Sequence, residues 1–191
     1  MKKILEVSTK PSKIMAIDAS TNSLAFSVFI DNDLHSFGKI KFAGNTPYDK
    51  VLDACRKTSA FIKHYDVEAI VIEHTVFMNS PKTAADLALV QGSLLGAAGL
   101  EGVRSIRSVA PITWQNFIGN KKMSKEESLA IRREFPGKSD SWYKTYERQL
   151  RKEKTIHFID VQYSKEVSDN DVADAIAIGH YAINNWDRLT R

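Results

Sequence analysis

Residues 13–42 read KIMAIDASTNSLAFSVFIDNDLHSFGKIKF, and three short strands account for this stretch. The first, 13–18, is apolar up to a terminal Asp18, and two further apolar runs follow at 24–30 and 34–42. Because the connections between them are so short, the three strands are expected to pair as an antiparallel meander. The stretch therefore predicts one half of a β-sheet, with a carboxylate at the end of its first strand.

The rest of the chain alternates between helical and strand patterns. The patterns predict a helix over 46–65, an almost wholly apolar strand over 67–73, a helix over 81–99, a strand over 103–109, two or three polar helices over 111–153, an extended piece over 155–161 and a last helix over 170–188. This order is typical of an α/β fold with a mixed five-stranded sheet, in which parallel strands reached by helical crossovers follow the meander. No linker or repeat divides the sequence, so residues 1–191 are expected to form a single domain.

Composition excludes several classes of protein. The chain of 191 residues is 43% hydrophobic and 26% charged, which is ordinary for a globular protein. The lone cysteine, Cys55, excludes a disulfide framework and a cysteine-based zinc finger. The amino-terminal segment lacks the apolar core of a signal peptide, and polar residues and glycines interrupt the apolar stretch 84–100. We expect a cytoplasmic protein, of a bacterium or a virus-infected host cell, with no membrane partner.

Positive charge gathers in one segment of the chain. Residues 104–154 hold thirteen Lys and Arg against six Asp and Glu, a net charge of +7, whereas the whole chain carries only +4. Such a concentration favours a polyanionic partner such as nucleic acid. A solvated helical face would explain the same charge equally well.

Two carboxylates interrupt apolar strands at their carboxyl ends. Asp18 ends the first predicted strand and Glu73 ends the fourth, at the edge where α/β sheets collect ligands. If these strands are parallel neighbours, the two acids lie side by side, repel each other and raise each other's pKa. A bound cation would relieve that repulsion.

The last predicted helix supplies two more acids, within the stretch SDNDVADAIAI that begins at Ser168. Asp171 and Asp174 are three residues apart, so they share one helical face. An N-cap would explain Asp169 or Asp171, but it does not explain Asp174 among apolar neighbours. We therefore favour a metal site. All-oxygen ligands select Mg²⁺ or Mn²⁺, and two such ions catalyse in-line phosphodiester displacement without a side-chain nucleophile.

The order of these motifs resembles the RuvC-type Holliday-junction resolvases of the RNase H-like nuclease superfamily. The resemblance spans about 14–119 and 168–184 and rests on Ile17-Asp18, Val71-Ile72-Glu73 with Phe77-Met78, a helix around Gln91-Gly92, and Asp171-Val-Ala-Asp174. It implies an RNase H-like sheet flanked by helices, with two Mg²⁺ ions, replaceable by Mn²⁺, bound by the four acids. The implied reaction is paired, symmetric nicking of four-way DNA junctions that leaves 5′-phosphate and 3′-hydroxyl ends.

The resemblance also implies roles in DNA binding. Phe77 would wedge into the junction, unless it folds onto its own domain, and Lys125 would lie near the scissile phosphate and take part in catalysis. The remaining predicted backbone contacts are Lys121, Lys122, Lys144, Arg148, Arg151 and Lys152. Two features depart from the family: Trp114 stands near a position that is basic in many relatives, and the segment 136–165 is longer than in compact bacterial resolvases.

Small residues form a second face on the predicted helix 81–99. These are Ala85, Ala88, Gly92, Gly96 and Gly99. Glycine destabilises a helix, so such a face indicates close approach of another backbone, either the domain's own sheet or a second subunit. The resemblance implies the second, a homodimer that would present two active sites to the two symmetry-related strands of a junction.

Three other functions compete with a junction resolvase. A related RNase H-like nuclease would use the same acids on flaps, Y-junctions or RNA–DNA hybrids. Half of an actin- or hexokinase-type ATPase would need a glycine that Asp18-Ala-Ser-Thr lacks. A non-catalytic module that binds branched DNA would have no need of all four acids.

Overall fold

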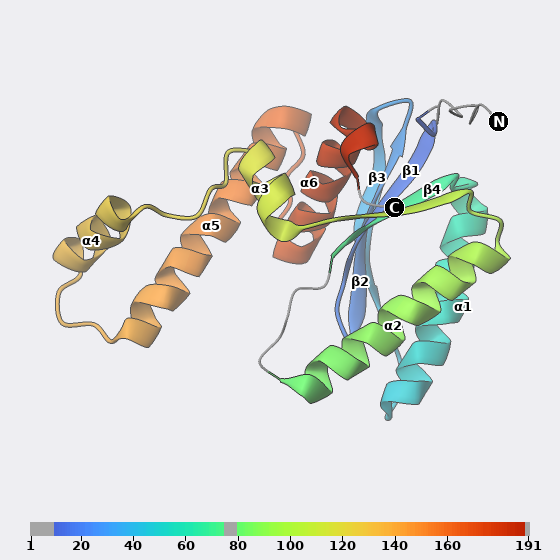
Figure 1. Ribbon diagram of the computed structural model, residues 1–191, viewed down its shortest axis with the longest axis horizontal. Helices are drawn as coiled ribbons and strands as arrows, with labels where there is room; N and C mark the ends of the chain where they lie inside the picture. Colours follow the sequence, from blue (N-terminus) through green and yellow to red (C-terminus); the bar gives the residue numbers. More distant parts are fainter. Residues whose placement is uncertain (1–9, 75–79, 190–191) are drawn as a thin grey trace, which may run out of the picture.

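The computed structural model describes residues 10–74 and 80–189. Its strands are β1 (Lys13–Ala19), β2 (Ser23–Ile30), β3 (Asp33–Lys41), β4 (Ala69–Glu73) and β5 (Ser105–Val109). Its helices are α1 (Pro47–Tyr65), α2 (Pro81–Leu100), α3 (Pro111–Phe117), α4 (Lys125–Glu134), α5 (Asp140–Tyr163), α6 (Asn170–Asn184) and a short 3₁₀ turn, Trp186–Arg188. Figure 1 shows how they are arranged.

The five strands form one mixed sheet in the order β3-β2-β1-β4-β5. Strands β1, β2 and β3 pair antiparallel, and β1 pairs with β4, and β4 with β5, in parallel. The predicted fold class, an antiparallel meander followed by parallel strands, is confirmed. Because the two acidic strands β1 and β4 are parallel neighbours, their carboxyl ends lie at the same edge.

Helices cover both faces of the sheet, with α1 and α2 on one side and α6, α5 and α3 on the other (Figure 1). Side chains alternate between the two layers, as the period of a strand requires. Met15 and Ile17 of β1 are buried in the cluster on the α1 and α2 side, whereas Ile14 and Ala16 belong to the cluster around α6. The parity of a strand residue therefore determines which helical layer it meets.

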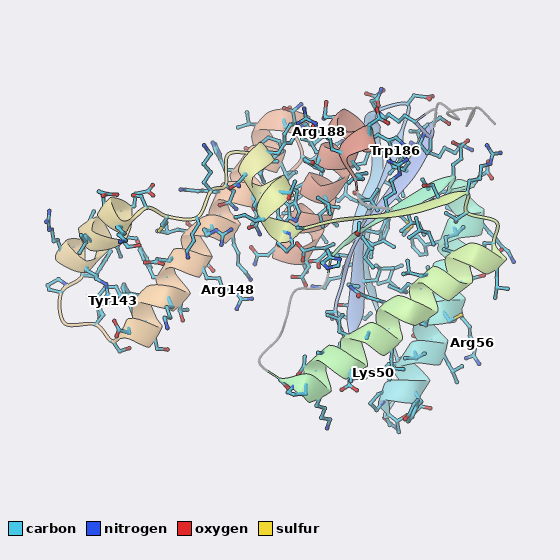
Figure 2. The ribbon with its side chains drawn as sticks, in the orientation of Figure 1. Lys50, Arg56, Tyr143, Arg148, Trp186 and Arg188 are labelled. Atoms are coloured by element: carbon cyan, nitrogen blue, oxygen red, sulfur yellow. The ribbon has the colours of Figure 1, made fainter. Side chains whose placement is uncertain are left out.

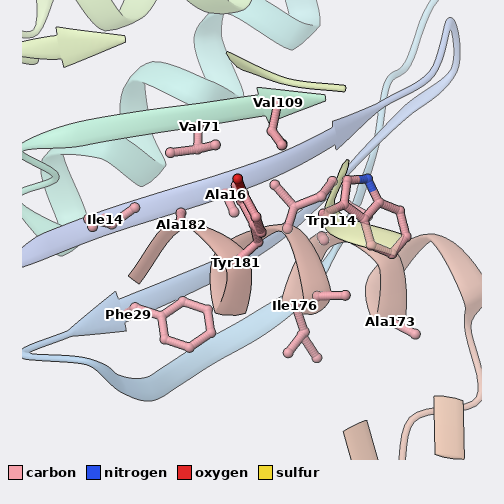
Figure 3. Packing of buried hydrophobic residues seen from close by; sticks show 14 of the residues in the cluster. Ile14, Ala16, Phe29, Val71, Val109, Trp114, Ala173, Ile176, Tyr181 and Ala182 are labelled. Carbon is pink, nitrogen blue, oxygen red and sulfur yellow. The ribbon is translucent and has the colours of Figure 1, made fainter. Parts of the chain in front are cut away.

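Helix α6 lies unusually close to β2, and Figure 3 shows the apolar packing beneath it. A Cβ atom on Gly179 would come within 2.3 Å of the Phe29 ring, so this position requires glycine. The Ser27 hydroxyl donates to the carbonyl of Ala175 at 2.8 Å and ties the same two elements together. This close packing sets the distance between α6 and the sheet. It thereby also positions the acids at the start of α6.

The predicted extended piece at 155–161 is wrong, because these residues continue the 24-residue helix α5. Thr155 and Ile159 are buried one helical turn apart, and Ile156 and Phe158 pack against the α6 cluster. The alternating apolar residues looked like a strand in sequence. Packing against α6 favours a helix over a strand here, because a helix places Thr155 and Ile159 on a single buried face.

Part of the basic segment projects from the body of the protein. Helix α4 and the first half of α5, up to Lys154, form a helical arm whose tip lies far from the sheet (Figure 1). The arm is held together at its tip by an ion pair between Arg132 and Asp140 at 2.8 Å, and Arg132 also lies 4.3 Å above the Tyr143 ring. The arm thus has its own contacts and presents most of its surface to solvent.

Candidate active site

Asp18 and Glu73 lie on the face of the sheet that α6 covers. Asp18 has the parity of the buried Ala16 in β1, and Glu73 has that of Val71 in β4. The parallel register pairs Ile17 with Ile72, so the two acids follow as direct neighbours at the carboxyl ends of their strands. This is the adjacency that the sequence predicted.

Helix α6 brings two further acids to the same edge. Asp169 is its N-cap and accepts hydrogen bonds from the backbone N–H groups of Asp171 at 2.9 Å and Val172 at 3.2 Å. The capping alternative therefore holds for Asp169 and leaves Asp171 and Asp174 without that role. All four predicted acids line one cavity of about 370 Å³: Asp18, Glu73, Asp171 and Asp174.

Three of the four acids have raised pKa values. Burial, together with the charges of Glu73, Asp174 and Asp171, raises the pKa of Asp18 to about 8. Burial and the charges of Glu73 and Asp171 raise the pKa of Asp174 to about 7. Burial also raises the pKa of Glu73. Such shifts arise when carboxylates share a poorly solvated pocket, and they mark candidate functional sites.

Lys39 is a member of this site that sequence reasoning missed. Its Nζ atom lies 2.5 Å from Asp171 Oδ2 and 3.0 Å from Asp169 Oδ2, and the hydrogen bond to Asp171 raises the pKa of Lys39. The strand register explains its position, because Asp18 pairs with Ala25 and Ala25 pairs with Lys39. A correct register for the meander would have placed Lys39 in the same row as Asp18.

Trp114, which the sequence marked only as a departure from the family, contacts the site directly. Its indole N–H donates to Glu73 Oε1 at 2.8 Å. The ring is 1% exposed and belongs to the α6 cluster, as Figure 3 shows. A buried donor held this firmly orients the carboxylate of Glu73, in the way that outer groups orient the ligands of metal sites.

We expect Trp114→Phe to weaken Mg²⁺ binding by roughly 10–100-fold, because Glu73 loses the donor that orients it. Mg²⁺ titrations of the cleavage rate and of protein fluorescence measure this change. Trp186→Phe is the matched control, since Trp186 is 4% exposed in the same cluster and does not line the acidic cavity. Equal Mg²⁺ affinities in the two variants would show that Trp114 acts through packing alone.

The donor chemistry of the site fits Mg²⁺ or Mn²⁺, because all four acids offer oxygen ligands. Among residues 10–74 and 80–189, however, no three His, Cys, Asp or Glu side chains are already arranged to hold one ion. Two of the acids already have partners: Lys39 contacts Asp171 Oδ2, and Trp114 donates to one oxygen of Glu73. A cation bound by Asp171 Oδ2 would compete with Lys39 for that atom.

The predicted basic residues separate into two groups. Arg148 and Lys152 of α5 line the acidic cavity, and Lys152 and Arg151 lower the pKa of Asp174 against the larger effect of its burial. Lys125 is the first residue of α4 on the arm and does not line that cavity. The others, Lys121, Lys122 and Lys144, are exposed on the approach to the arm and on α5. Phe77 lies outside the described residues.

Comparison with known proteins identifies the fold. The structure superposes on Thermus thermophilus RuvC in complex with a Holliday junction substrate with a TM-score of 0.64 and 15% identity, covering 94% of this chain and 99% of that one. A second Thermus thermophilus RuvC structure gives 0.64 and 14% over 93% and 98%. The yeast mitochondrial Holliday junction resolvase Ydc2 gives 0.52 and 11% over 88% and 76%. No family model matches the sequence, and no curated protein does. The chain therefore has the fold of RuvC at low sequence identity.

Proposed function

We propose that the protein is a metal-dependent, structure-selective DNA endonuclease that resolves four-way junctions by paired nicks. One observation carries the proposal: four carboxylates from β1, β4 and α6 line a single cavity. They do so on the fold of RuvC, one structure of which is a complex with a Holliday junction substrate. The basic arm beside the cavity supports a polyanionic substrate.

The four acids would hold two Mg²⁺ ions, with Mn²⁺ as a substitute. When bound, such ions lower the pKa of the attacking water and stabilise charge on the leaving oxygen. The water oxygen bonds to phosphorus as the bond to the 3′ oxygen breaks, which leaves 5′-phosphate and 3′-hydroxyl ends. Within the chain, Trp114 holds the carboxylate of Glu73 in one orientation, and the cations Arg148 and Lys152 offset the charge of the DNA.

Helix α2 supports a homodimer. Its small residues 85, 88, 92, 96 and 99 are all exposed, and a Cβ atom on any of its three glycines would meet nothing within 4 Å in the described structure. The domain's own sheet is therefore not the partner of this face. The helix is long and apolar enough to cross a membrane by length and composition, yet only 22% of that apolar window is buried. A second copy of α2 would cover it and pair two active sites.

Gly96→Arg is expected to produce a folded monomer, because the residue is exposed and open space surrounds it, while its charge would prevent close helix contact. We expect the dimer dissociation constant to rise by more than ~100-fold, equivalent to about 2.7 kcal/mol. Analytical ultracentrifugation measures it, and junction cleavage should change from paired to single nicks. Ala60→Arg, on the exposed surface of α1, is the control. A wild-type monomer at micromolar concentrations on junction DNA would contradict the dimer.

A cleavage panel tests the function itself. Wild-type protein with Mg²⁺ is offered a four-way junction, a flap, a Y-junction, a linear duplex and an RNA–DNA hybrid of shared sequence. We expect symmetric nicks in the junction at a rate at least tenfold above the others. Preferred cutting of the flap, Y-junction or hybrid would assign the site to a related nuclease. Tight junction binding without cutting in Mg²⁺ or Mn²⁺ would indicate a non-catalytic module.

A further inference from the structure

A second cavity adjoins the acidic one. It has a volume of about 180 Å³ and lies between α3, the segment that follows it, and α5. Its lining residues are Gln115, Asn120, Arg148, Arg151, Lys152, Thr155 and Asp174. Arg148, Lys152 and Asp174 line both cavities, so the two are direct neighbours.

The lining of this second cavity is built to receive an anion. It holds three cations and one carboxylate, and within the described residues neither Arg148 nor Lys152 forms an ion pair. The guanidinium of Arg151 donates to Gln115, which fixes its direction, while its Nε–H is buried without a partner. Three cationic groups therefore lie beside the acids and have N–H donors that no group in the described part of the chain accepts from.

The wall opposite these cations is rigid. Asn120 is 3% exposed, and its amide donates to the Arg151 carbonyl at 2.8 Å and to the Thr155 hydroxyl at 2.9 Å. Its Oδ1 atom is buried without a partner among the described residues, so it is free to accept a hydrogen bond. This side chain ties the segment after α3 to α5 and keeps the cavity from collapsing.

The cations continue outward along α5. Lys144, Arg148 and Lys152 are four residues apart, so they form one stripe on the helix, about 12 Å long. Figure 2 shows Arg148 on the side of α5 toward the body of the protein and Tyr143 on the side toward α4. The stripe therefore starts at the acidic cavity and leads away from it, which suits a backbone with one phosphate per ~3.4 Å of helix axis.

We propose that this second cavity is a phosphate subsite, which holds a phosphodiester of the cleaved strand next to the one that the acids receive. Arg148 and Lys152 bind that phosphate, Arg151 supports it from below, and Lys144 contacts the next stretch of the same strand. This inference rests on the proposed function, since it presumes a DNA strand in the acidic cavity. It places a phosphate contact on α5, whereas the resemblance implies only Lys125 near the scissile phosphate.

The test compares two pairs of charge removals. The subsite variant is Arg148→Gln with Lys152→Gln, and the matched control is Arg56→Gln with Lys63→Gln, two exposed cations of α1 outside both cavities and outside the arm. Junction binding is measured in EDTA across a series of salt concentrations. The subsite variant should lower the slope of log K against log [salt] by ~0.9, because its two cations share one phosphate contact. A third variant, Arg148→Lys with Lys152→Arg, should keep the wild-type slope.

Single-turnover cleavage in Mg²⁺ with the junction saturated by protein gives the second readout. We expect at least a tenfold loss for the subsite variant and less than threefold for the control, with thermal melting to show that each variant is folded. Equal slopes and equal rates in the subsite and control pairs would overturn the subsite. A wild-type protein that cuts no junction would instead overturn the proposed function, and the salt slopes would still report on the subsite.

Discussion

Asp18→Asn is expected to abolish junction cleavage and, at the same time, to stabilise the protein. Metal ions contribute several kcal/mol of transition-state stabilisation, and each 1.36 kcal/mol is a factor of ten, so losing a central ligand should lower the rate by ~10³-fold or more. Junction binding in EDTA should stay within about threefold of wild type, because the basic arm is unchanged. Single-turnover cleavage and equilibrium binding measure the two effects.

The gain in stability follows from the pKa of Asp18. This pKa is raised from 3.8 to about 8 in the folded protein, so the folded state binds more protons than the unfolded state between these values. The contribution of Asp18 to the free energy of unfolding of metal-free wild type should therefore be greatest below pH 4 and should be lost as the pH rises through 8. Asparagine carries no charge, so the variant should melt above wild type at pH 8.5 and close to it at pH 5.

The control for this comparison is Asp160→Asn, an exposed acid of α5 outside the acidic cavity. It should leave the cleavage rate unchanged and show no pH-dependent difference in melting temperature. A melting temperature of Asp18→Asn below that of wild type at pH 8.5 without metal would contradict the prediction that the buried charge of Asp18 destabilises the folded protein.

Removal of divalent cations is the second change with a large expected effect. Wild-type protein in EDTA should show no cleavage above background, and Mg²⁺ or Mn²⁺ should restore it. The affinity for Mg²⁺ should also rise with pH. Asp18 and Asp174, with pKa values of about 8 and 7, hold protons that the ion must displace, so each proton released makes the apparent affinity up to tenfold stronger per pH unit.

Titrations of Mg²⁺ at pH 6, 7, 8 and 9, followed by the cleavage rate and by calorimetry in two buffers, test this directly. Calorimetry counts the protons released on binding, and we expect the count to fall as the pH passes 8. Asp174→Asn should reduce that count and flatten the pH dependence. Cleavage that persists in EDTA would falsify the metal mechanism, whereas affinity independent of pH would contradict the proton displacement alone.

The small net charge of the chain conceals two opposed features. The segment 104–154 carries +7, while the acidic cavity gathers four carboxylates. The helical arm includes the first part of α5, and the cations of α5 that line that cavity, Arg148 and Lys152, lie near the middle of this helix. Helix α5 thus lines the acidic cavity through residues near its middle and presents its first residues to solvent.

Much of the site could be predicted because its signals are local. Asp18 and Glu73 end apolar strands, and Asp171 and Asp174 share a helical face, so periodicity alone placed each acid on an element. The helical continuation at 155–161 was missed because a short alternating apolar run fits a strand and a helix alike. Contact with α6 decides between them.

The positions of Lys39, Trp114 and the two α5 cations beside the acids could not be found in this way, although Arg148 and Lys152 were predicted as DNA-backbone contacts. Lys39 enters the site through strand register, Trp114 through a hydrogen bond that spans 41 residues of sequence, and Arg148 and Lys152 through the path of a long helix. None of these leaves a spacing in the sequence, because each depends on where two distant elements meet.

The sequence by itself predicted the five strands of the sheet and the four acids that the structure gathers in one cavity, and its oxygen ligands lead us to expect a hard cation, because these follow from residue chemistry and local periodicity. Only the tertiary structure decided which cations face the acids and that Lys125 is not among them, and it alone showed that Lys39 and Trp114 hold two of the acids in place. The physical reason is that a side chain's electrostatic partners are set by distance in space, and the packing of α6 and α5 on the sheet sets that distance.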